Sequence, residues 1–104
     1  MDKKLIVAGL CGPGRHEMPV QEYLYPNIVE NPMDFERLYN HAHGYITQLQ
    51  FEQGCPLHVM LFVTGLTPVL TSFLSAWKKE AGEDDLLTLM HFNRDTGLYV
   101  GQHF

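Results

Sequence analysis

The sequence predicts a small Rossmann-like α/β domain with a mostly parallel four-stranded sheet, helices on its faces and a C-terminal antiparallel hairpin at its edge. Short apolar segments of strand length alternate with two long segments of helical periodicity. Helical connections of that length join parallel strands by right-handed crossovers. Only a turn sequence, residues 93–97, separates the last two apolar segments, so these two are expected to pair as a hairpin.

The first quarter of the chain contains one predicted strand and one ambiguous segment. Residues 4–10 are a short apolar strand, and the glycine- and proline-rich residues 11–16 form the loop that follows it. Residues 18–31 mix aromatic, acidic and proline residues without a clear period. Within them, residues 21–25 are compatible with one helical turn or with an ordered connection.

The middle of the chain predicts a helix, a buried strand and a second helix. The first helix starts at Asn31-Pro32 and ends at residues 54–56, and its apolar residues recur at steps of three and four. Residues 57–64 form an almost continuous apolar run, which is typical of a strand buried on both faces of a parallel sheet. The second helix runs from Thr67 to about Ala81 and ends at two lysines and a glycine.

The last twenty residues predict two strands joined by a tight turn. Residues 86–92 and 98–103 are the strands, and Asn93-Arg94-Asp95-Thr96-Gly97 is the turn between them. No repeat, linker or low-complexity segment interrupts the chain, so residues 1–104 are expected to form a single domain.

Composition limits the classes of ligand. The chain has 7 Lys and Arg against 12 Asp and Glu, a formal net charge of −5, so it lacks the long basic stripe of a general nucleic-acid-binding protein. Any nucleotide ligand is therefore expected to be small and held locally. Hydrophobic residues make up 45% of the chain, which is typical of a folded domain with one core.

Cysteine content and hydropathy predict the compartment. Cys11 and Cys55 form no metal motif and are too few for a secreted disulfide scaffold, which favours a reducing cytoplasm. The apolar segment after Lys4 has about six residues, fewer than the core of a signal peptide. No apolar run reaches the roughly 20 residues that cross a bilayer. We expect a soluble cytoplasmic protein without a membrane partner.

A strand that runs directly into a helix at Gly65-Leu66-Thr67-Pro68 predicts an anion site. Thr67 can cap the helix, Pro68 suits its first turn, and the positive end of the helix dipole faces the space where a phosphate or carboxylate would bind. A well-capped helix without a ligand is the alternative, because such caps are often purely structural.

The loop after the first strand would reach the same edge of the sheet if the first two strands are parallel neighbours. Glycines permit close approach of a ligand, and an arginine can bind a phosphate through two hydrogen bonds. The expected ligand-binding residues are Gly12, Gly14, Arg15, Gly65, Leu66 and Thr67, with His16 as a general acid or base. Ordinary turn chemistry also explains the glycines, and the pattern is neither G-x-G-x-x-G nor a Walker loop.

His91, Asp95 and His103 can ligate a divalent metal or move protons. If Phe92 pairs with Leu98, His91 faces Tyr99, and His103 lies roughly 13 Å further along its strand. A site that uses these residues together with the glycine loops must then join two subunits. The alternative is that Asp95 is a turn residue and both histidines lie near the surface.

The other histidines of the chain are expected to have no catalytic role. His41 and His43 are two residues apart on a helix and therefore point in different directions, so we expect both to be solvated. His58, at the start of a buried strand, is expected to be structural.

Residues 59–103 resemble the small CRISPR-associated ring-nuclease family, distant relatives of CRISPR-associated Rossmann-fold domains that bind cyclic oligoadenylate. The resemblance lies in a Gly-x-x-Pro helix opening, Gly65 to Pro68, and in a strand-end His91, a turn Asp95 and a late His103. It implies that a ring of adenylates binds between subunits stacked head to tail and is degraded with manganese. The chain differs from the family in having Arg94 before Asp95 instead of an Asp-Pro-Arg order, and its first half has no counterpart there.

The sequence thus predicts a cyclic-oligonucleotide-binding protein of phage defence or counter-defence and, if it is an enzyme, a metal-dependent phosphodiesterase that uses Mn²⁺. The alternatives are a non-catalytic nucleotide- or anion-binding module and a structural homo-oligomeric interaction domain. An apolar sheet of this size leaves helix faces and an edge to cover, so we expect a homodimer or a higher homo-oligomer. The expected roles are phosphate binding by Gly65, Thr67 and Arg15, proton transfer by His16, and metal binding or nucleophile orientation by His91 together with Asp95 or with a neighbouring subunit's His103.

Overall fold

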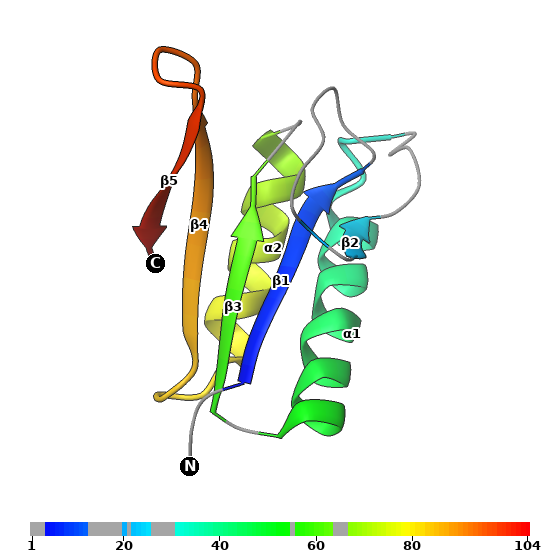
Figure 1. Cartoon of the computed structure of the whole chain (residues 1–104). Helices are drawn as coiled ribbons and strands as arrows, with labels where there is room; N and C mark the ends of the chain where they lie inside the picture. Colours follow the sequence, from blue (N-terminus) through cyan, green and yellow to red (C-terminus); the bar gives the residue numbers. More distant parts are fainter. Residues whose placement is uncertain (1–3, 13–19, 21, 26–30, 55, 64–66) are drawn as a thin grey trace.

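A computed structural model confirms the α/β class and the mostly parallel sheet (Figure 1). It describes residues 4–12, 20, 22–25, 31–54, 56–63 and 67–104. The elements are β1 Lys4–Cys11, β2 Glu22–Tyr25, α1 Phe35–Gln53, β3 Leu57–Phe62, α2 Thr67–Glu80, β4 Leu86–Asn93 and β5 Leu98–His103.

The sheet has five strands, one more than the sequence predicts, in the order β2-β1-β3-β4-β5. The first four are mutually parallel, and β5 runs antiparallel to β4. The additional strand is Glu22–Tyr25, which pairs with β1 from Ala8 to Cys11. A four-residue segment is too short to show an alternating pattern, and here pairing with the central strand β1 decides its conformation.

Both helices lie on one face of the sheet (Figure 1). The connections β2–α1–β3 and β3–α2–β4 progress in the same direction across the strand order, so two right-handed crossovers bring both helices to the same side. Alternate strand residues share this core with both helices, among them Ala8, Leu10, Leu57, Val59, Leu61, Leu87 and Leu89. The expectation of helices on its faces is thus met on one face only.

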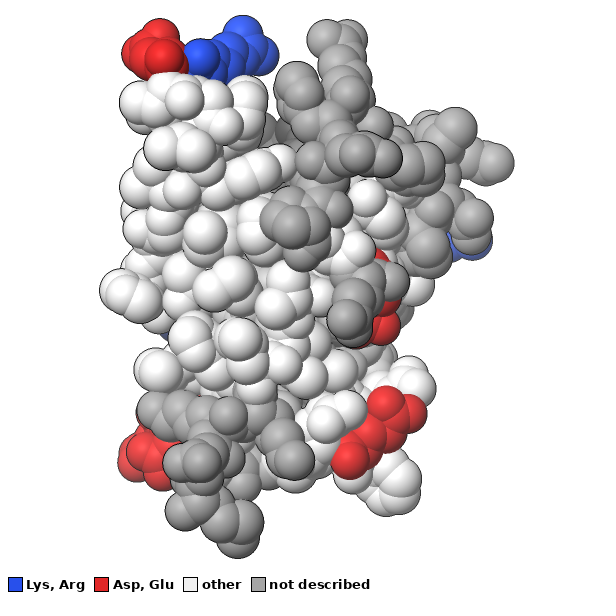
Figure 2. Space-filling view, in the orientation of Figure 1, with Lys and Arg blue, Asp and Glu red and all other residues white. Residues whose placement is uncertain are grey.

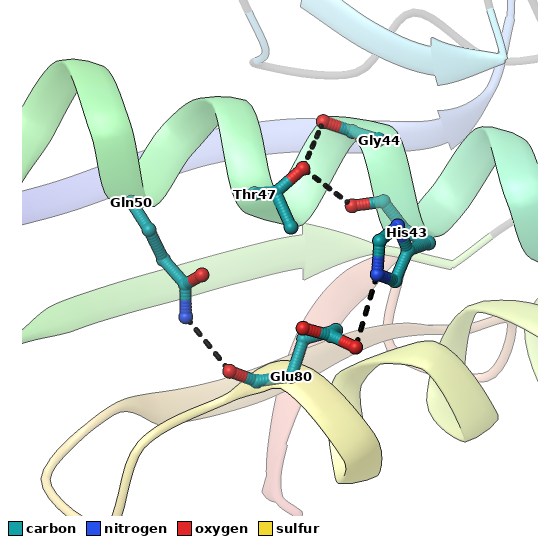
Figure 3. A network of polar contacts seen from close by, with 5 residues as sticks. All are labelled: His43, Gly44, Thr47, Gln50 and Glu80. Carbon is teal, nitrogen blue, oxygen red and sulfur yellow. Dashed lines mark hydrogen bonds and ion pairs between the residues drawn. The ribbon is translucent and has the colours of Figure 1, made fainter.

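Polar contacts hold α1 against α2 (Figure 3). His43 Nε2 lies 3.0 Å from Glu80 Oε1, and Gln50 Nε2 donates to the Glu80 carbonyl oxygen at 2.9 Å. His43 was expected to be solvated, but its ring is half-buried and has an acidic partner on the neighbouring helix. These contacts fix how the C-terminal part of α2 lies against the middle of α1.

The ends of α1 carry the capping groups that its sequence suggests. Asp34 is the N-cap, and its Oδ1 accepts the backbone N–H of Arg37 at 3.3 Å, so the helix begins after Asp34 and not at Asn31. Gly54 ends the helix with φ of 75°, where its N–H donates to the Gln50 carbonyl oxygen. Neither described helix is long and apolar enough to span a membrane.

A buried carboxylate fixes the start of β3. Asp85, which is 9% exposed, accepts the backbone N–H of Leu57 at 2.7 Å through Oδ1 and that of Gly82 at 2.9 Å through Oδ2. The turn after α2 is thereby joined to the first residue of β3. Two charge-assisted hydrogen bonds offset the cost of burying this side chain.

The opposite face of the sheet carries no charged side chain on its described strands. The residues that alternate with the core positions point to this face: Leu5 and Val7 on β1, His58, Met60 and Phe62 on β3, Leu86, Thr88, Met90 and Phe92 on β4, and Tyr99 and His103 on β5. Figure 2, in the orientation of Figure 1, shows white atoms over the middle of the view and red and blue atoms around its margins. We call this face of the sheet, opposite the two helices, the open face.

Candidate functional site

The predicted anion site requires that the first strand and the buried strand 57–64 be parallel neighbours, and β1 and β3 are. The two strands are parallel neighbours, and Gly9 pairs with Phe62 near their carboxyl ends. The segments that follow them therefore leave the same edge of the sheet. Gly12 and Thr67 are described there, whereas Gly14, Arg15, His16, Gly65 and Leu66 lie outside the described residues.

Gly12 has a packing reason to be glycine. A Cβ atom at this position would lie 2.2 Å from Cδ1 and Cε1 of Tyr23. Its N–H donates to the Tyr25 carbonyl oxygen at 3.2 Å. The side-chain space of Gly12 is therefore filled by the ring of Tyr23 on the neighbouring strand.

Thr67, which the sequence suggests as the helix cap, is the first helical residue of α2. The side chain is exposed, and Pro68 follows it in the first turn. No acidic side chain occupies that turn, while Lys78 and Lys79 occupy the last one. The positive end of the α2 dipole is thus not neutralised by a carboxylate of its own first turn.

The register of the β4–β5 hairpin differs by one residue from the predicted one. Phe92 pairs with Tyr99, and His91 pairs with Val100. The cause is a turn of four residues, 94–97, closed by a hydrogen bond from Gly97 N–H to the Asn93 carbonyl oxygen at 2.8 Å, with φ of 73° at Gly97. A shift of one residue moves a side chain to the other face of a sheet.

This shift separates the predicted metal ligands. His91 shares the helix-covered face with Leu87 and Leu89, and its Nε2 donates to Gln102 Oε1 at 2.8 Å. His103 pairs with Thr88 on the open face. The two histidines of one chain therefore lie on opposite faces of the sheet.

Asp95 lies in the exposed turn at the tip of the hairpin. Its backbone N–H donates to Asn93 Oδ1 at 2.9 Å, which is a local turn contact. Among the residues that the structure describes, no three His, Cys, Asp or Glu side chains are grouped so that they could hold a metal ion. His91, Asp95 and His103 of a single chain thus do not fit one Mn²⁺ ion.

A hydrogen-bonded row of side chains on the open face was missed by the sequence analysis. Thr88 Oγ1 lies 2.9 Å from His58 Nε2 and 3.3 Å from His103 Nδ1, so one nearly buried hydroxyl joins two imidazoles on the neighbouring strands. The hydroxyl can donate to one ring and accept from the other. Polar residues at matching positions of three adjacent strands were the signal, but the signal becomes visible only once the strand order and register are known.

The carboxyl ends of β1 and β2 contain groups whose chemistry is suppressed by burial. Burial raises the pKa of the Cys11 thiol to about 11, so it stays protonated near neutral pH and is a poor nucleophile. Tyr25 donates its O–H to the Leu38 carbonyl oxygen at 2.6 Å, and burial raises its pKa strongly. His41 is exposed, as expected, but its Nε2 also donates to the Leu24 carbonyl oxygen at 2.6 Å and its ring stacks on Tyr25.

These contacts tie α1 to the edge strand β2 and give Tyr25 and His41 a structural role. The described groups with a potential for chemistry are therefore Thr67 at the carboxyl edge, His58, Thr88 and His103 on the open face, and His91 on the helix-covered face.

Comparison of the chain with protein-family models, with curated proteins and with solved structures gave no match.

Proposed function

We propose that the protein binds a cyclic oligonucleotide of the cyclic oligoadenylate type, in phage defence or counter-defence, at the carboxyl edge of β1 and β3. The observation that carries the proposal is the parallel pairing of β1 with β3, from Lys4 opposite Leu57 to Gly9 opposite Phe62. Ligands of open α/β sheets bind outside the carboxyl ends of neighbouring strands, where helix N-termini favour negative charge.

Thr67 supports this proposal electrostatically. It begins α2 with an exposed side chain and without a first-turn carboxylate, so backbone N–H groups of the helix start are available to an anion. In the proposal, Gly65, Leu66 and Thr67 contact one phosphate, and Gly12, Gly14 and Arg15 contact another part of the ring. His16 supplies or accepts a proton.

The proposal also includes cleavage of the bound ring. His91 and His103 of one chain lie on opposite faces, so a catalytic site that uses both requires two subunits. Manganese would be held by His91 and Asp95 of one subunit with His103 of another, and it would stabilise negative charge on the phosphodiester. A homo-oligomer is therefore part of the same proposal.

A non-catalytic nucleotide-binding module is the second candidate. It is favoured by the side-chain partners of the histidines, because His91 bonds Gln102 and His103 contacts Thr88. In that function the glycine loops bind the ring and the histidines stabilise the hairpin. Ligand affinity would then be unchanged by a chelator.

The test is incubation of the protein with a panel of cyclic oligonucleotides, with and without manganese, followed by separation of intact rings from linear products. Binding of one ring without cleavage supports the module, and manganese-dependent linear products support the phosphodiesterase. Binding of no ring in the panel contradicts both functions.

A matched pair of variants localises the site. Gly65→Arg should abolish binding by filling the space above the α2 start. Gly44→Arg is the control, because Gly44 is exposed on α1 and no other atom lies within 4 Å of a Cβ placed there. Binding that survives Gly65→Arg would remove the proposed site.

A further inference from the structure

We propose that β5 is a dimerisation edge: two copies of the chain pair antiparallel through their β5 strands, across a two-fold axis at Gly101, and join two sheets into one. β5 is the last strand in the sheet order, so one of its sides has no strand partner within the chain. The pairing needs no ligand, and it leaves His91 of one chain and His103 of the partner subunit on opposite faces of the joined sheet, so it is a different contact from the one that the proposed cleavage site requires.

The register identifies the backbone groups on the outer side of β5. Phe104 N–H donates to the Leu87 carbonyl oxygen at 3.0 Å, which makes these two residues a hydrogen-bonded pair of the antiparallel ladder. Such pairs alternate along the ladder, so Gln102, Val100 and Leu98 also bond to β4. The N–H and C=O groups that point outward then belong to Tyr99, Gly101 and His103.

The β5 edge lacks the devices that keep edge strands apart. Residues 96–104 contain no Lys, Arg, Asp, Glu or Pro, and pairing with β4 is continuous from Leu98 to His103 without a bulge. Leu98 and Val100 are 66% and 53% exposed. An exposed, uncharged and apolar strand edge is a template for pairing with another strand.

The outward groups of β5 match a second β5. In an antiparallel pair centred on Gly101, Gly101 bonds its own copy, and Tyr99 bonds His103 of the partner subunit in both directions. All three outward residues are then hydrogen-bonded, and the contact is the same for both copies, as a two-fold axis requires. Gly101 leaves the axis free of side chains, where its Thr88 and Met90 neighbours on β4 already lie close.

Electrostatics favour this edge for association between copies. A net charge of −5 on each chain makes two copies repel one another, and the repulsion is weakest where they meet through a surface free of carboxylate side chains. β5 is such a surface. Pairing also buries part of the exposed apolar surface of Leu98 and Val100. A second copy, not an unrelated peptide, is therefore the proposed occupant.

Pairing would extend the row of polar side chains on the open face. His103 contacts Thr88, which contacts His58, and antiparallel pairing sets Tyr99 of the partner subunit opposite His103. Tyr99 itself packs edge-on against Phe62 with ring centroids 4.8 Å apart. The partner thus adds Tyr99 to the same face of the joined sheet as His103.

The experiment compares the molar mass of the wild-type chain with that of two lysine variants by size-exclusion chromatography with light scattering. Val100→Lys adds one charge per copy next to the proposed axis, on an exposed side chain. Like charges across paired strands oppose association, so this variant should have half the wild-type mass with an unchanged circular dichroism spectrum. Leu5→Lys is the control: it adds the same charge at a side chain that is 55% exposed on β1, and it should stay dimeric.

Amide hydrogen exchange provides a second measurement. The N–H groups of Tyr99, Gly101 and His103 should exchange slowly in the wild-type chain and rapidly in Val100→Lys, whereas those of Val100 and Gln102 should be protected in both. A monomeric wild-type chain, a dimeric Val100→Lys, or dissociation by Leu5→Lys alone would overturn the proposal. The last result would assign the contact to the open face.

Discussion

His91 and His103 lie on opposite faces of the β4–β5 hairpin: the former bonds Gln102 on the helix-covered side, and the latter contacts Thr88 on the open side. A side chain cannot pass through a hydrogen-bonded sheet, so the two imidazoles of one chain cannot meet at one phosphate. This relationship makes any joint chemistry of the pair a property of two subunits.

Mixing two inactive variants should restore activity if such a shared site cleaves the ring. His91→Ala and His103→Ala should each abolish manganese-dependent cleavage, while a co-refolded equal mixture should regain about a quarter of wild-type activity, because random assembly of a two-fold dimer leaves that share of the sites intact. The measurement is the rate of linear-product formation. Full activity of either single variant would exclude a joint role.

Thr67→Glu should weaken anion binding while leaving the fold intact. A carboxylate in the first turn interacts favourably with the α2 dipole, so the free energy of unfolding should rise by about 0.3–1 kcal/mol. The same charge repels a phosphate, and ring affinity should fall by about tenfold or more, equivalent to about 1.4 kcal/mol. Thr71→Glu, one turn later on the same exposed side of α2, is the control for net charge. Titration calorimetry and urea unfolding check both expectations, and equal losses of affinity in the two variants would contradict a site at the helix start.

Gly12→Ala should destabilise the protein even without a ligand. The added methyl group would collide with the Tyr23 ring, and overpacking of this kind costs about 1–3 kcal/mol. Urea unfolding of the single variants and of the double variant Gly12→Ala with Tyr23→Ala measures the coupling. The double variant should lose less stability than the sum of the two single changes. Additive losses would show that Tyr23 is not the obstacle.

Asp85→Ala should destabilise the chain by about 1–3 kcal/mol, because the N–H of Leu57 would lose its acceptor in a buried position. Asp84→Ala removes the same charge from an exposed neighbour and should change stability by no more than about 0.5 kcal/mol. Chemical denaturation monitored by Trp77 fluorescence compares the two variants. Similar midpoints would contradict a structural role for the Asp85 carboxylate.

Cys11 should make stability depend on pH in the alkaline range. Its pKa is raised from 9.0 to about 11 by burial, so between these values the unfolded chain releases a proton that the folded chain retains. The contribution of the Cys11 thiol to the free energy of unfolding is therefore fully present below pH 9.0, and it falls as the pH rises toward about 11. Urea midpoints of the wild-type chain and of Cys11→Ser, measured across this range, should converge as the pH rises if the thiol is the cause. Parallel curves would assign the alkaline loss to other groups.

The sequence predicts the fold class because the two long helices and the apolar strands carry strong periodic signals. Leu98 to His103 has the predicted bounds, and α2 ends within one residue of its prediction. Local sequence patterns do not predict the structure correctly where pairing between strands decides it. Glu22–Tyr25 is too short to show a period, and the register of β4 with β5 depends on whether Asn93 belongs to the turn or to the strand.

The candidate site is predicted less completely for the same physical reason. Strand ends and glycine loops are visible in a sequence, so the common edge of β1 and β3 could be expected. The row of His58, Thr88 and His103 depends on the alignment of β3 with the distant strand β4 and on the exact register of the β4–β5 hairpin, and no local pattern contains both. His41 and His43 likewise have partners on other elements, which a helical spacing rule cannot supply.

The position of β1 between β2 and β3 sets the order in which the chain can fold. The first strand to emerge during synthesis must wait for β3, and closing that loop of about 50 residues carries an entropic cost before its contacts contribute. The nascent β1 is therefore an apolar segment without its main neighbour until more than half of the chain has been made. Refolding should therefore be slower than that of a domain of the same size built mainly from local contacts.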